Sequence, residues 1–370
     1  MSPSVAIVGS RGYPSFYGGF ETLIRHLAPY LADQGWNVAV YGRSETEGEA
    51  ARADPRIDRR HSRGVDTQRL STLTYGLTAS FDTCVRRPDV ALVLNIANGF
   101  WLPMLRARGV PTVVNVDGIE WQRAKWGPLA RGTFRKGARL TASFADELVC
   151  DAKEIARFWS ETYGRKGIYI PYGADVPDEG SPPDELGDRP YALVVARLVP
   201  ENTVAEFVAA ADAITAHCDV VIVGSSGYGG PLEAAVADLA QRSPSVRWFG
   251  HLSDDATLFS LWRHAAAYFH GHSVGGTNPA LVQAMACGAP IVARDTVYAR
   301  EVLEDSAHLC APTPDAIASA VIDLVTNVEE QKVLSKRAVE RARRSFSWES
   351  VCASYAQALE DVATRGRAHR

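Results

Sequence analysis

The sequence predicts an α/β protein made of two doubly wound, Rossmann-like domains, each with a parallel sheet covered by helices. Three observations support this class: a length of 370 residues, short apolar runs that alternate with helical patterns, and a proline-rich break near the middle. At roughly 100 to 200 residues per domain, this length suits two domains. Because ligands of such sheets bind at the carboxyl ends of the strands, we expect a central cleft that both domains face.

The N-terminal half predicts the first domain, over residues 1–178. Residues 5–8 are a short apolar run that ends in a glycine, which is typical of a buried parallel strand. Residues 21–34 then repeat apolar side chains at helical spacing until Gly35 ends the helix. Further strand patterns follow at residues 37–41, 90–94, 112–116, 148–150 and 168–171.

A break at residues 176–190 separates two runs of this pattern. It contains four prolines and a cluster of acids, which predicts a linker. The alternation of strands and helices then restarts and predicts a second domain over residues 179–345. Its strand patterns are residues 191–195, 219–223, 246–249, 267–269 and 290–293, and its helical patterns include residues 201–217 and 280–287.

The charge is distributed unevenly between the two halves. Residues 1–175 carry 23 Lys and Arg against 18 Asp and Glu, a net +5, whereas residues 176–370 carry 16 against 25, a net −9. A basic N-terminal half suits an anionic partner such as a lipid phosphate or an anionic membrane surface. An Arg-rich, solvated surface is the alternative, and the sequence leaves both open.

The six cysteines and the first residues of the sequence indicate the cellular compartment in which we expect the protein. The cysteines lie far apart, without a C-x-x-C pair or a His at zinc-ligand spacing, which indicates buried thiols in a reducing compartment and no structural zinc. The first residues lack a signal-peptide pattern, and no apolar stretch reaches the ~18 residues of a membrane span. We expect a cytoplasmic protein, or one peripheral on the inner membrane face, and no nucleic-acid partner.

The most informative stretch is a glycine turn followed by a helix start, at residues 270–290. Thr277 or Asn278 can cap the helix, and Pro279 suits its first turn. The free backbone N–H groups and the helix dipole then form an anion site, for which a pyrophosphate is the natural ligand. Gly275 and Gly276 let that ligand approach the backbone closely. The alternative is an ordinary capped helix behind a tight turn.

The same helix carries a family resemblance. Gln283, about one turn further on, is placed to reach a ribose hydroxyl. Residues 285–293, M-A-C-G-A-P-I-V-A, resemble the A-M-A-C/S-G-x-P-V-V-A stretch of glycosyltransferase family 4, a family with the GT-B fold. The family's E-x7-E glutamates would fall at Gly275 and Gln283. The first contacts the donor sugar, which Gly275 cannot do, and the second binds the ribose, which Gln283 still can.

A second stretch, residues 195–203, places an arginine just after a strand. The Arg197 guanidinium offers a fork of donors to a pyrophosphate, although a surface ion pair is the alternative. The stretch resembles the family's G-R-L-x-x-x-K-G, in which Arg and Lys neutralise the leaving diphosphate. Arg197 matches the Arg, whereas Asn202 stands at the Lys position and supplies no charge. The P-E-N and S-V-G-G-T-N-P forms are similar to a bacterial branch of rhamnosyltransferases that lacks the first glutamate.

The first loop argues against a dinucleotide cofactor. Gly9 and Gly12 do not have the spacing of G-x-G-x-x-G, and Arg43 follows the second strand where a dinucleotide fingerprint expects an acid. Instead, Gly18, Gly19 and Glu21 form a G-G-x-E pattern. It resembles the family's N-terminal loop, which covers the donor phosphates and borders the acceptor.

Asp117 ends another strand of this half, in a D-G-x-E-W stretch that is also similar to the rhamnosyltransferase branch. Its carboxylate is a candidate to hydrogen-bond a sugar hydroxyl or to assist deprotonation of the acceptor. Capping of the following helix is the alternative.

Smaller resemblances extend over nearly the whole chain. Gly224 begins a turn like the family's phosphate-side turn, and Gly250 and His251 resemble its nucleobase-contacting loop. Residues 171–175 resemble its P-x-G-x-D segment before the linker. The F-S-W at residues 346–348 implies that residues 346–370 form a C-terminal helix that crosses back to the N-terminal domain.

Basic and aromatic residues gather between residues 121 and 139, which hold six basic residues and no acid. They suggest contact with a membrane surface or a lipid-linked acceptor, with a solvated basic helix as the alternative. The candidate contact residues are Trp121, Arg123, Lys125, Trp126, Arg135 and Lys136.

Together these patterns predict a glycosyltransferase that uses a nucleotide diphosphate sugar and, as the resemblance implies, retains the anomeric configuration. The branch resemblance suggests dTDP-L-rhamnose as donor, and a hydroxyl of a glycan, a lipid-linked or a small-molecule acceptor. Without a D-x-D motif we expect no metal, and no cofactor. An epimerase or hydrolase of the same fold and a catalytically inactive sugar-nucleotide-binding protein are the alternatives.

Overall fold

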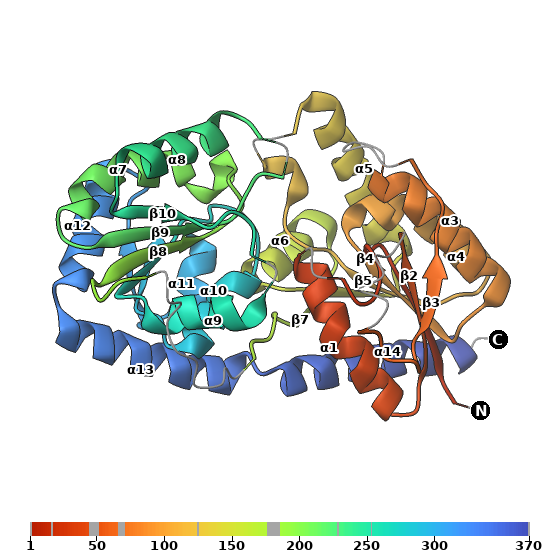
Figure 1. Cartoon of the computed structure of the whole chain (residues 1–370). Helices are drawn as coiled ribbons and strands as arrows, with labels where there is room; N and C mark the ends of the chain where they lie inside the picture. Colours follow the sequence, from red (N-terminus) through yellow and green to blue (C-terminus); the bar gives the residue numbers. More distant parts are fainter. Residues whose placement is uncertain are drawn as a thin grey trace. The chain divides into compact units, whose positions relative to one another are not determined.

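A computed structural model describes residues 2–15, 18–43, 52–65, 71–123, 126–175, 186–227, 229–252 and 254–368. Contacts divide the chain into two compact units. The first contains residues 1–172 and 348–370, and the second contains residues 173–347. Each unit is a parallel sheet with helices on its faces, so the predicted fold class is confirmed (Figure 1).

The sheet of the first unit has seven strands in the order β3-β2-β1-β4-β5-β6-β7. Every pair is parallel, with Val5 of β1 opposite Val38 of β2 and Val90 of β4. The chain order reverses at β1 and β4, which is where doubly wound sheets bind their ligands. The strands are β1 (Ser4–Val8), β2 (Asn37–Gly42), β3 (Asp58–His61), β4 (Val90–Leu94), β5 (Thr112–Asn115), β6 (Glu147–Cys150) and β7 (Ile168–Tyr169).

Helices and short 3-10 turns connect these strands. They are α1 (Gly19–Asp33), α3 (Ser71–Arg86), η1 (Ile96–Trp101), α4 (Leu102–Ala107), η2 (Glu120–Gln122), α5 (Pro128–Phe144), α6 (Lys153–Tyr163) and the C-terminal α14 (Trp348–Ala368). α14 packs against α1, β4 and β5 of this unit. Asp89 helps to hold it, since its carboxylate accepts hydrogen bonds from the Ser4 N–H at 2.9 Å and from Arg367 Nε at 3.0 Å.

The sheet of the second unit has six parallel strands in the order β10-β9-β8-β11-β12-β13. Its chain order reverses at β8 and β11. The strands are β8 (Tyr191–Val195), β9 (Asp219–Val223), β10 (Val246–Trp248), β11 (Ala267–His270), β12 (Ile291–Arg294) and β13 (Ala307–Cys310). The helices are η3 (Pro200–Asn202), α7 (Val204–Thr215), α8 (Pro231–Arg242), α9 (Asp255–His264), α10 (Pro279–Cys287), α11 (Val297–Leu303), α12 (Pro314–Val325) and α13 (Val328–Ser345).

Both cores are apolar and closely packed. In the second unit, Phe207 of α7 stacks on Phe269 of β11 with ring centroids 5.3 Å apart. All six cysteines are buried free thiols, as expected. Burial raises the pKa of Cys150 to about 12 and that of Cys218 to about 11, so both stay protonated at neutral pH.

Two details differ from the prediction. The helix expected from residue 201 begins at Val204, because residues 200–202 form a 3-10 turn and Thr203 has a positive φ of 58°. Most of the predicted linker, residues 176–185, lies outside the described residues. Contacts change from one unit to the other after residues 172 and 347, while the predicted domain boundaries stand at residues 178 and 345.

Candidate functional site

The candidate donor site is built on the loop that follows β8. Arg197 stands two residues beyond the end of this strand and is exposed. Within the described part of the chain, its guanidinium forms no salt bridge. The surface ion pair that was the alternative for Arg197 is therefore not seen, and its donors are available to an anion.

The 3-10 turn behind Arg197 is held by its neighbours. Asn202 is buried, and its Nδ2 donates a hydrogen bond to the Arg197 carbonyl at 2.9 Å. The Asn202 amide therefore supports the arginine loop, and direct contact of Asn202 with the donor stays a prediction.

Glu201, in the same turn, was not predicted as a site residue. It is only 7% exposed, and neither of its carboxyl oxygens has a hydrogen-bond partner among the described residues. Burying an unsatisfied carboxylate is costly, so a hydroxyl-rich ligand that donates to it would remove this cost. The sequence does contain a signal that could have indicated Glu201 as a site residue: it is an acid close behind a buried strand and near Arg197.

The loop after β11 lies beside the loop after β8, because these two strands are neighbours in the sheet. The Ser273 N–H and Oγ–H donate to the Glu201 carbonyl at 2.9 and 2.8 Å. Gly271 leaves no room for a side chain, since a Cβ there would lie 2.4 Å from the Asn202 carbonyl oxygen. The two predicted phosphate-binding segments therefore share one edge of the second sheet.

This second loop ends in the predicted helix start. Asn278 is the N-cap of α10, with its Oδ1 accepting from the Ala280 N–H at 2.9 Å, and Pro279 is the first helical residue. Thr277 is buried. Gly275 has a positive φ of 111°, a conformation that favours glycine, with open space where a side chain would stand. Gly276 is partly exposed.

Gln283 already has partners within the second unit. Its Oε1 accepts from the Asp175 N–H at 2.9 Å, and its Nε2 donates to the Asp175 carbonyl at 3.0 Å. An amide both donates and accepts, whereas a glutamate at this position could not donate to that carbonyl. Gln283 thus ties residue 175 to α10, and its predicted contact with a ribose is not tested by this arrangement.

The turn after β9 packs against the arginine loop. A Cβ at Gly224 would lie 1.9 Å from the Ala196 carbonyl oxygen, and the Gly224 N–H donates to the Gly250 carbonyl at 2.6 Å. The two predicted glycines therefore meet, and the neighbouring His251 is exposed.

The same turn also binds an acid of α8. The Glu233 carboxylate accepts from the Ser226 backbone N–H at 3.2 Å and from the Ser225 hydroxyl at 3.0 Å. Hydrogen bonds led by that of the Ser226 hydroxyl lower the pKa of Glu233 below its usual value. This carboxylate therefore takes an N–H that a phosphate would otherwise use, and the predicted donor contact of Gly224 stays a prediction.

The predicted site residues of the first unit gather near Tyr172. Burial, and then the nearby carboxylates, foremost that of Asp117, raise the pKa of Tyr172, and Glu21 is among the contributing acids. Glu21 is buried in the first turn of α1, where its Oε1 accepts from the Arg11 N–H at 3.0 Å. Gly18 and Gly19 begin this helix. Several carboxylates therefore lie close to Tyr172, and the predicted donor contact of Gly18, Gly19 and Glu21 stays a prediction.

Asp117 does not cap the helix that follows it, since the N-cap of η2 is Ile119. Its backbone has a positive φ of 56°, and its N–H donates to Asn115 Oδ1 at 2.9 Å. Asn115 in turn donates to the Tyr355 hydroxyl of α14 at 2.6 Å. The C-terminal helix thus holds the loop that presents Asp117.

The predicted membrane-contact residues divide into two groups. Arg123 is turned inward, with a side chain only 13% exposed and an ion pair to Glu120 at 2.7 Å. Trp126 donates from Nε1 to the same Glu120 at 3.0 Å, and Trp121 packs on Phe158. These three side chains have partners within the unit, and their contact with a membrane surface stays a prediction.

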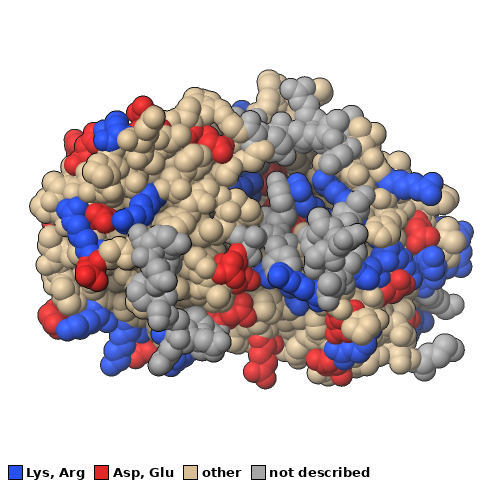
Figure 2. Space-filling model, in the orientation of Figure 1, with Lys and Arg blue, Asp and Glu red and all other residues tan. Residues whose placement is uncertain are grey.

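The remaining predicted contact residues lie on α5 or outside the described chain. Arg135 and Lys136 are exposed on α5, and Lys125 lies outside the described residues. On the face drawn in Figure 2, Lys and Arg side chains lie on both units, interspersed with Asp and Glu.

Comparison with solved structures defines the class of protein. The chain is similar over 98% of its length to a sucrose-phosphate synthase from Thermosynechococcus elongatus, with all of that chain covered, a TM-score of 0.81 and 17% identity. It is similar over 97% of its length to Anabaena HepE in complex with UDP-glucose, with 99% of that chain covered, a TM-score of 0.75 and 14% identity. The fold is therefore that of the GT-B glycosyltransferases.

Sequence comparison gives the family. Residues 17–176 match the model of Glycosyltransferase Family 4, and residues 189–327 match that of Glycosyl transferases group 1. The chain therefore belongs to the family 4 glycosyltransferases.

Several curated relatives are mannosyltransferases. A phosphatidyl-myo-inositol mannosyltransferase of Mycolicibacterium smegmatis is 31% identical over 226 residues, which are 58% of this chain and 57% of the relative. The chain thus matches little more than half the length of this relative. An O-antigen chain mannosyltransferase B of Escherichia coli is 25% identical over 128 residues, covering 34% of this chain and 33% of that protein. The rhamnosyltransferase branch finds no support in these relatives.

Among the described helices, none combines the length and the apolar character that a bilayer span requires. The described His, Cys, Asp and Glu side chains form no cluster of three or more that could hold a metal ion.

Proposed function

We propose that this protein transfers a glycosyl group from a nucleoside diphosphate sugar to a hydroxyl group. One observation carries the proposal: an exposed guanidinium without a salt bridge to a described residue, on a loop that is hydrogen-bonded to the loop leading into α10. Arg197 and the N–H groups at the start of α10, around Thr277 and Asn278, stabilise the diphosphate as it leaves. Donors fixed in advance at such a place contribute about 3–4 kcal/mol each to the transition state.

In the proposed reaction, the bond between the sugar C1 and the diphosphate oxygen breaks. The electron pair leaves with the diphosphate, and the acceptor oxygen forms a new bond to C1. Because the resemblance implies retention, we propose attack on the same face, without a covalent intermediate on the protein. The acceptor proton passes to the leaving phosphate, and the anomeric configuration is retained. An inverted product would contradict this step.

The acceptor side of the proposal rests on the first unit. Asp117 supplies a carboxylate near Tyr172, to which an acceptor hydroxyl can donate. We propose that Asp117 orients the reacting hydroxyl or helps to deprotonate it. A lipid-linked acceptor, met at the inner face of a membrane, agrees with the relatives that are named for phosphatidyl-myo-inositol and with the basic α5.

The donor sugar has two candidates. The S-V-G-G-T-N-P loop favours dTDP-L-rhamnose, whereas the named relatives, one group of them GDP-mannose-dependent, favour GDP-mannose. In either case the missing carboxylate at Gly275 needs a substitute. The buried, unpartnered Glu201 in the adjoining loop is our candidate for that contact.

The test is product analysis with each nucleotide sugar, with and without a mixture of glycan and lipid acceptors. Transfer that requires an acceptor supports the proposal. A free sugar or an isomerised nucleotide sugar formed equally without acceptor would identify a hydrolase or an epimerase. Binding without turnover over all acceptors would identify an inactive binding protein.

A further inference from the structure

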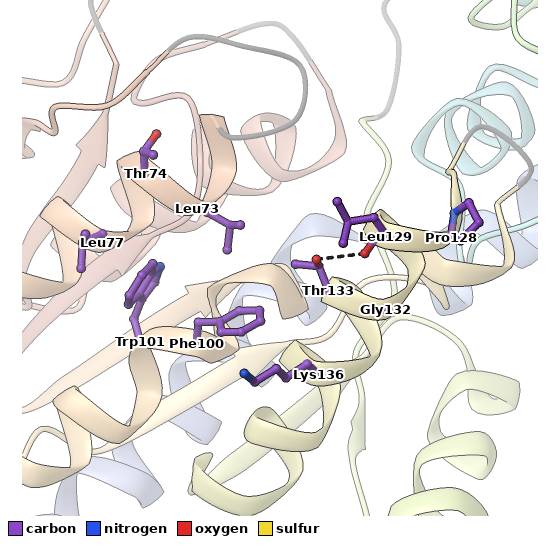
Figure 3. Close-up of a pocket in the computed structure, with 10 residues that line it drawn as sticks. All are labelled: Leu73, Thr74, Leu77, Phe100, Trp101, Pro128, Leu129, Gly132, Thr133 and Lys136. Atoms are coloured by element: carbon purple, nitrogen blue, oxygen red, sulfur yellow. Dashed lines mark hydrogen bonds between the residues drawn. The ribbon is translucent and has the colours of Figure 1, made fainter.

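The first unit contains a cavity that is lined mostly by apolar side chains. It has a volume of about 590 Å³ and lies within the first unit between α3, η1 and α5 (Figure 3). Leu73 and Leu77 of α3 form one wall, Phe100 and Trp101 of η1 form the floor, and the N-terminal half of α5 forms the other wall. This size is within the range of a small-molecule site.

Glycines explain why the cavity exists. α5 packs closely on η1 at Gly137, where a Cβ would lie 2.5 Å from the Ile96 carbonyl oxygen. Gly99 fits the same contact, since its Cβ would lie 2.4 Å from the Gly137 carbonyl oxygen. Further toward the start of the helix, Gly132 lines the cavity and has no atom within 4 Å of a built Cβ. The space is therefore left open by a missing side chain.

The cavity continues into an exposed apolar strip on α3. Leu77, Phe81 and Val85 follow one another at a spacing of four residues, and they are 40%, 62% and 62% exposed. On the opposite wall, Leu129 of α5 is 86% exposed. Large apolar side chains exposed together around a cavity mark a binding surface rather than ordinary surface variation.

Cations border this apolar surface. α5 contains no acid, and Arg131, Arg135 and Arg139 repeat at a spacing of four residues, so they share one face beside the cavity wall. Lys136 lines the cavity itself, with its Nζ 5.8 Å from the centroid of the Phe100 ring. Among described residues, none of these four cations has a carboxylate partner. Their charge is therefore available to an anion.

We propose that this cavity binds the hydrocarbon chain of a phosphate-bearing lipid, while the cations of α5 bind its phosphate. The inference rests on the proposed function, for which such a lipid would be the acceptor or its carrier. An apolar cavity with an apolar entrance matches a hydrocarbon chain, and unpaired cations at its border match a phosphate rather than a neutral or cationic head group.

The first measurement uses soluble alkyl phosphates of increasing chain length, below the concentration at which they form micelles, with the full chain. Binding should tighten roughly fourfold for each added CH₂, since burying one is worth about 0.8 kcal/mol. The corresponding alkanol should bind at least tenfold more weakly, and inorganic phosphate should show no such affinity. Affinity that does not depend on chain length would overturn the proposal.

The second measurement fills the cavity. Gly132→Leu projects a side chain into the open space and also replaces a helical glycine, so the fold should not suffer. It should weaken binding of the longest alkyl phosphate at least tenfold, whereas Ser143→Leu, an exposed position of α5 outside the cavity, should leave it unchanged. Leu77→Asp at the entrance should weaken binding as well. Unchanged binding in both cavity variants would overturn the proposal.

Two further arms separate the alternatives. Binding to vesicles of phosphatidylcholine and phosphatidylglycerol, without binding of monomeric alkyl phosphates, would mean a membrane-docking face and no lipid site. Stabilisation by nucleoside diphosphates is recorded for each variant in parallel. If nucleoside diphosphates still stabilise the protein while lipid binding fails, the proposed function stands and only the lipid site is excluded. If nucleoside diphosphates do not stabilise the wild-type protein, the result counts against the proposed function instead.

Discussion

The two units have the same parallel architecture but present different charged side chains after their strands. In the second unit, the loops after β8 and β11 present the unpaired Arg197 and the start of α10. In the first unit, the first turn of α1 carries the carboxylate of Glu21 and the loop after β5 carries that of Asp117, while the four cations of α5 have no carboxylate partner among the described residues. Under the proposed function, the charged side chains after the strands, rather than the fold that both units share, decide which ligand each unit binds.

Among the substitutions that test this comparison between the two units, we expect the largest loss of activity at Arg197. Arg197→Ala should lower the rate of glycosyl transfer by at least about 100-fold, the scale for losing one preorganised donor to a developing anion. Stability should hardly change, because this side chain is exposed. Steady-state kinetics measure the loss. Arg242→Ala, which removes an exposed arginine paired with Asp212, is the matched control and should retain full activity.

A smaller effect is expected at Gln283. Gln283→Glu should lower the free energy of unfolding by about 1–3 kcal/mol, because a carboxylate cannot donate to the partly buried Asp175 carbonyl. Denaturant unfolding measures this, with the exposed Gln122→Glu as control. A variant as stable as the wild type, but with weaker nucleotide binding, would instead favour the ribose contact that the family resemblance implies.

The helix caps allow a sharper comparison within the second unit. Asn278 caps α10 and Asn327 caps α13, each with a side chain that accepts from a backbone N–H. Replacing either by Ala should destabilise the protein by about 1 kcal/mol. Only Asn278→Ala should also weaken binding of a nucleoside diphosphate, measured by calorimetry. Equal affinity in the two variants would argue against a role for the start of α10.

The smallest effect concerns pH and the first unit. Burial tends to raise the pKa of Asp89, but hydrogen bonds from Arg367 and Ser4 outweigh it and hold that pKa below its usual value of 3.8. A carboxyl with a lowered pKa stabilises the fold at neutral pH, and this contribution is lost as the pH falls through the folded-state pKa. Unfolding midpoints of the wild type and Asp89→Asn should therefore converge below about pH 4. A constant difference down to pH 3 would contradict this role.

The fold could be predicted because buried parallel strands are short apolar runs, as at residues 5–8 and 219–223. β3 was missed, since its sequence D-R-R-H belongs to an edge strand that is largely exposed and shows no such run. The cap at Asn278 was predictable from local sequence, because a cap and its N–H partner are neighbours in the chain.

Long-range partners were not predictable from local patterns. Gln283 pairs with a residue 108 positions away, and no periodicity reports such a contact. The Arg123 side chain is largely buried because it forms an ion pair with Glu120. Glu120 lies just outside the acid-free stretch from which a membrane contact was predicted, so that stretch alone did not reveal the pair. The cavity depends on the absence of a side chain at Gly132, which a single sequence does not distinguish from any other helical glycine.

The most direct test of the central claim is a thermal-shift titration that compares GDP, UDP and dTDP with their monophosphates, in the wild type and in Arg197→Ala. A ligand that binds the folded state stabilises it in proportion to the logarithm of its concentration. We predict that at least one diphosphate binds about tenfold or more tightly than its monophosphate, and that Arg197→Ala removes this difference. Equal binding of diphosphate and monophosphate by the wild type, or a difference that survives in the variant, would contradict the account.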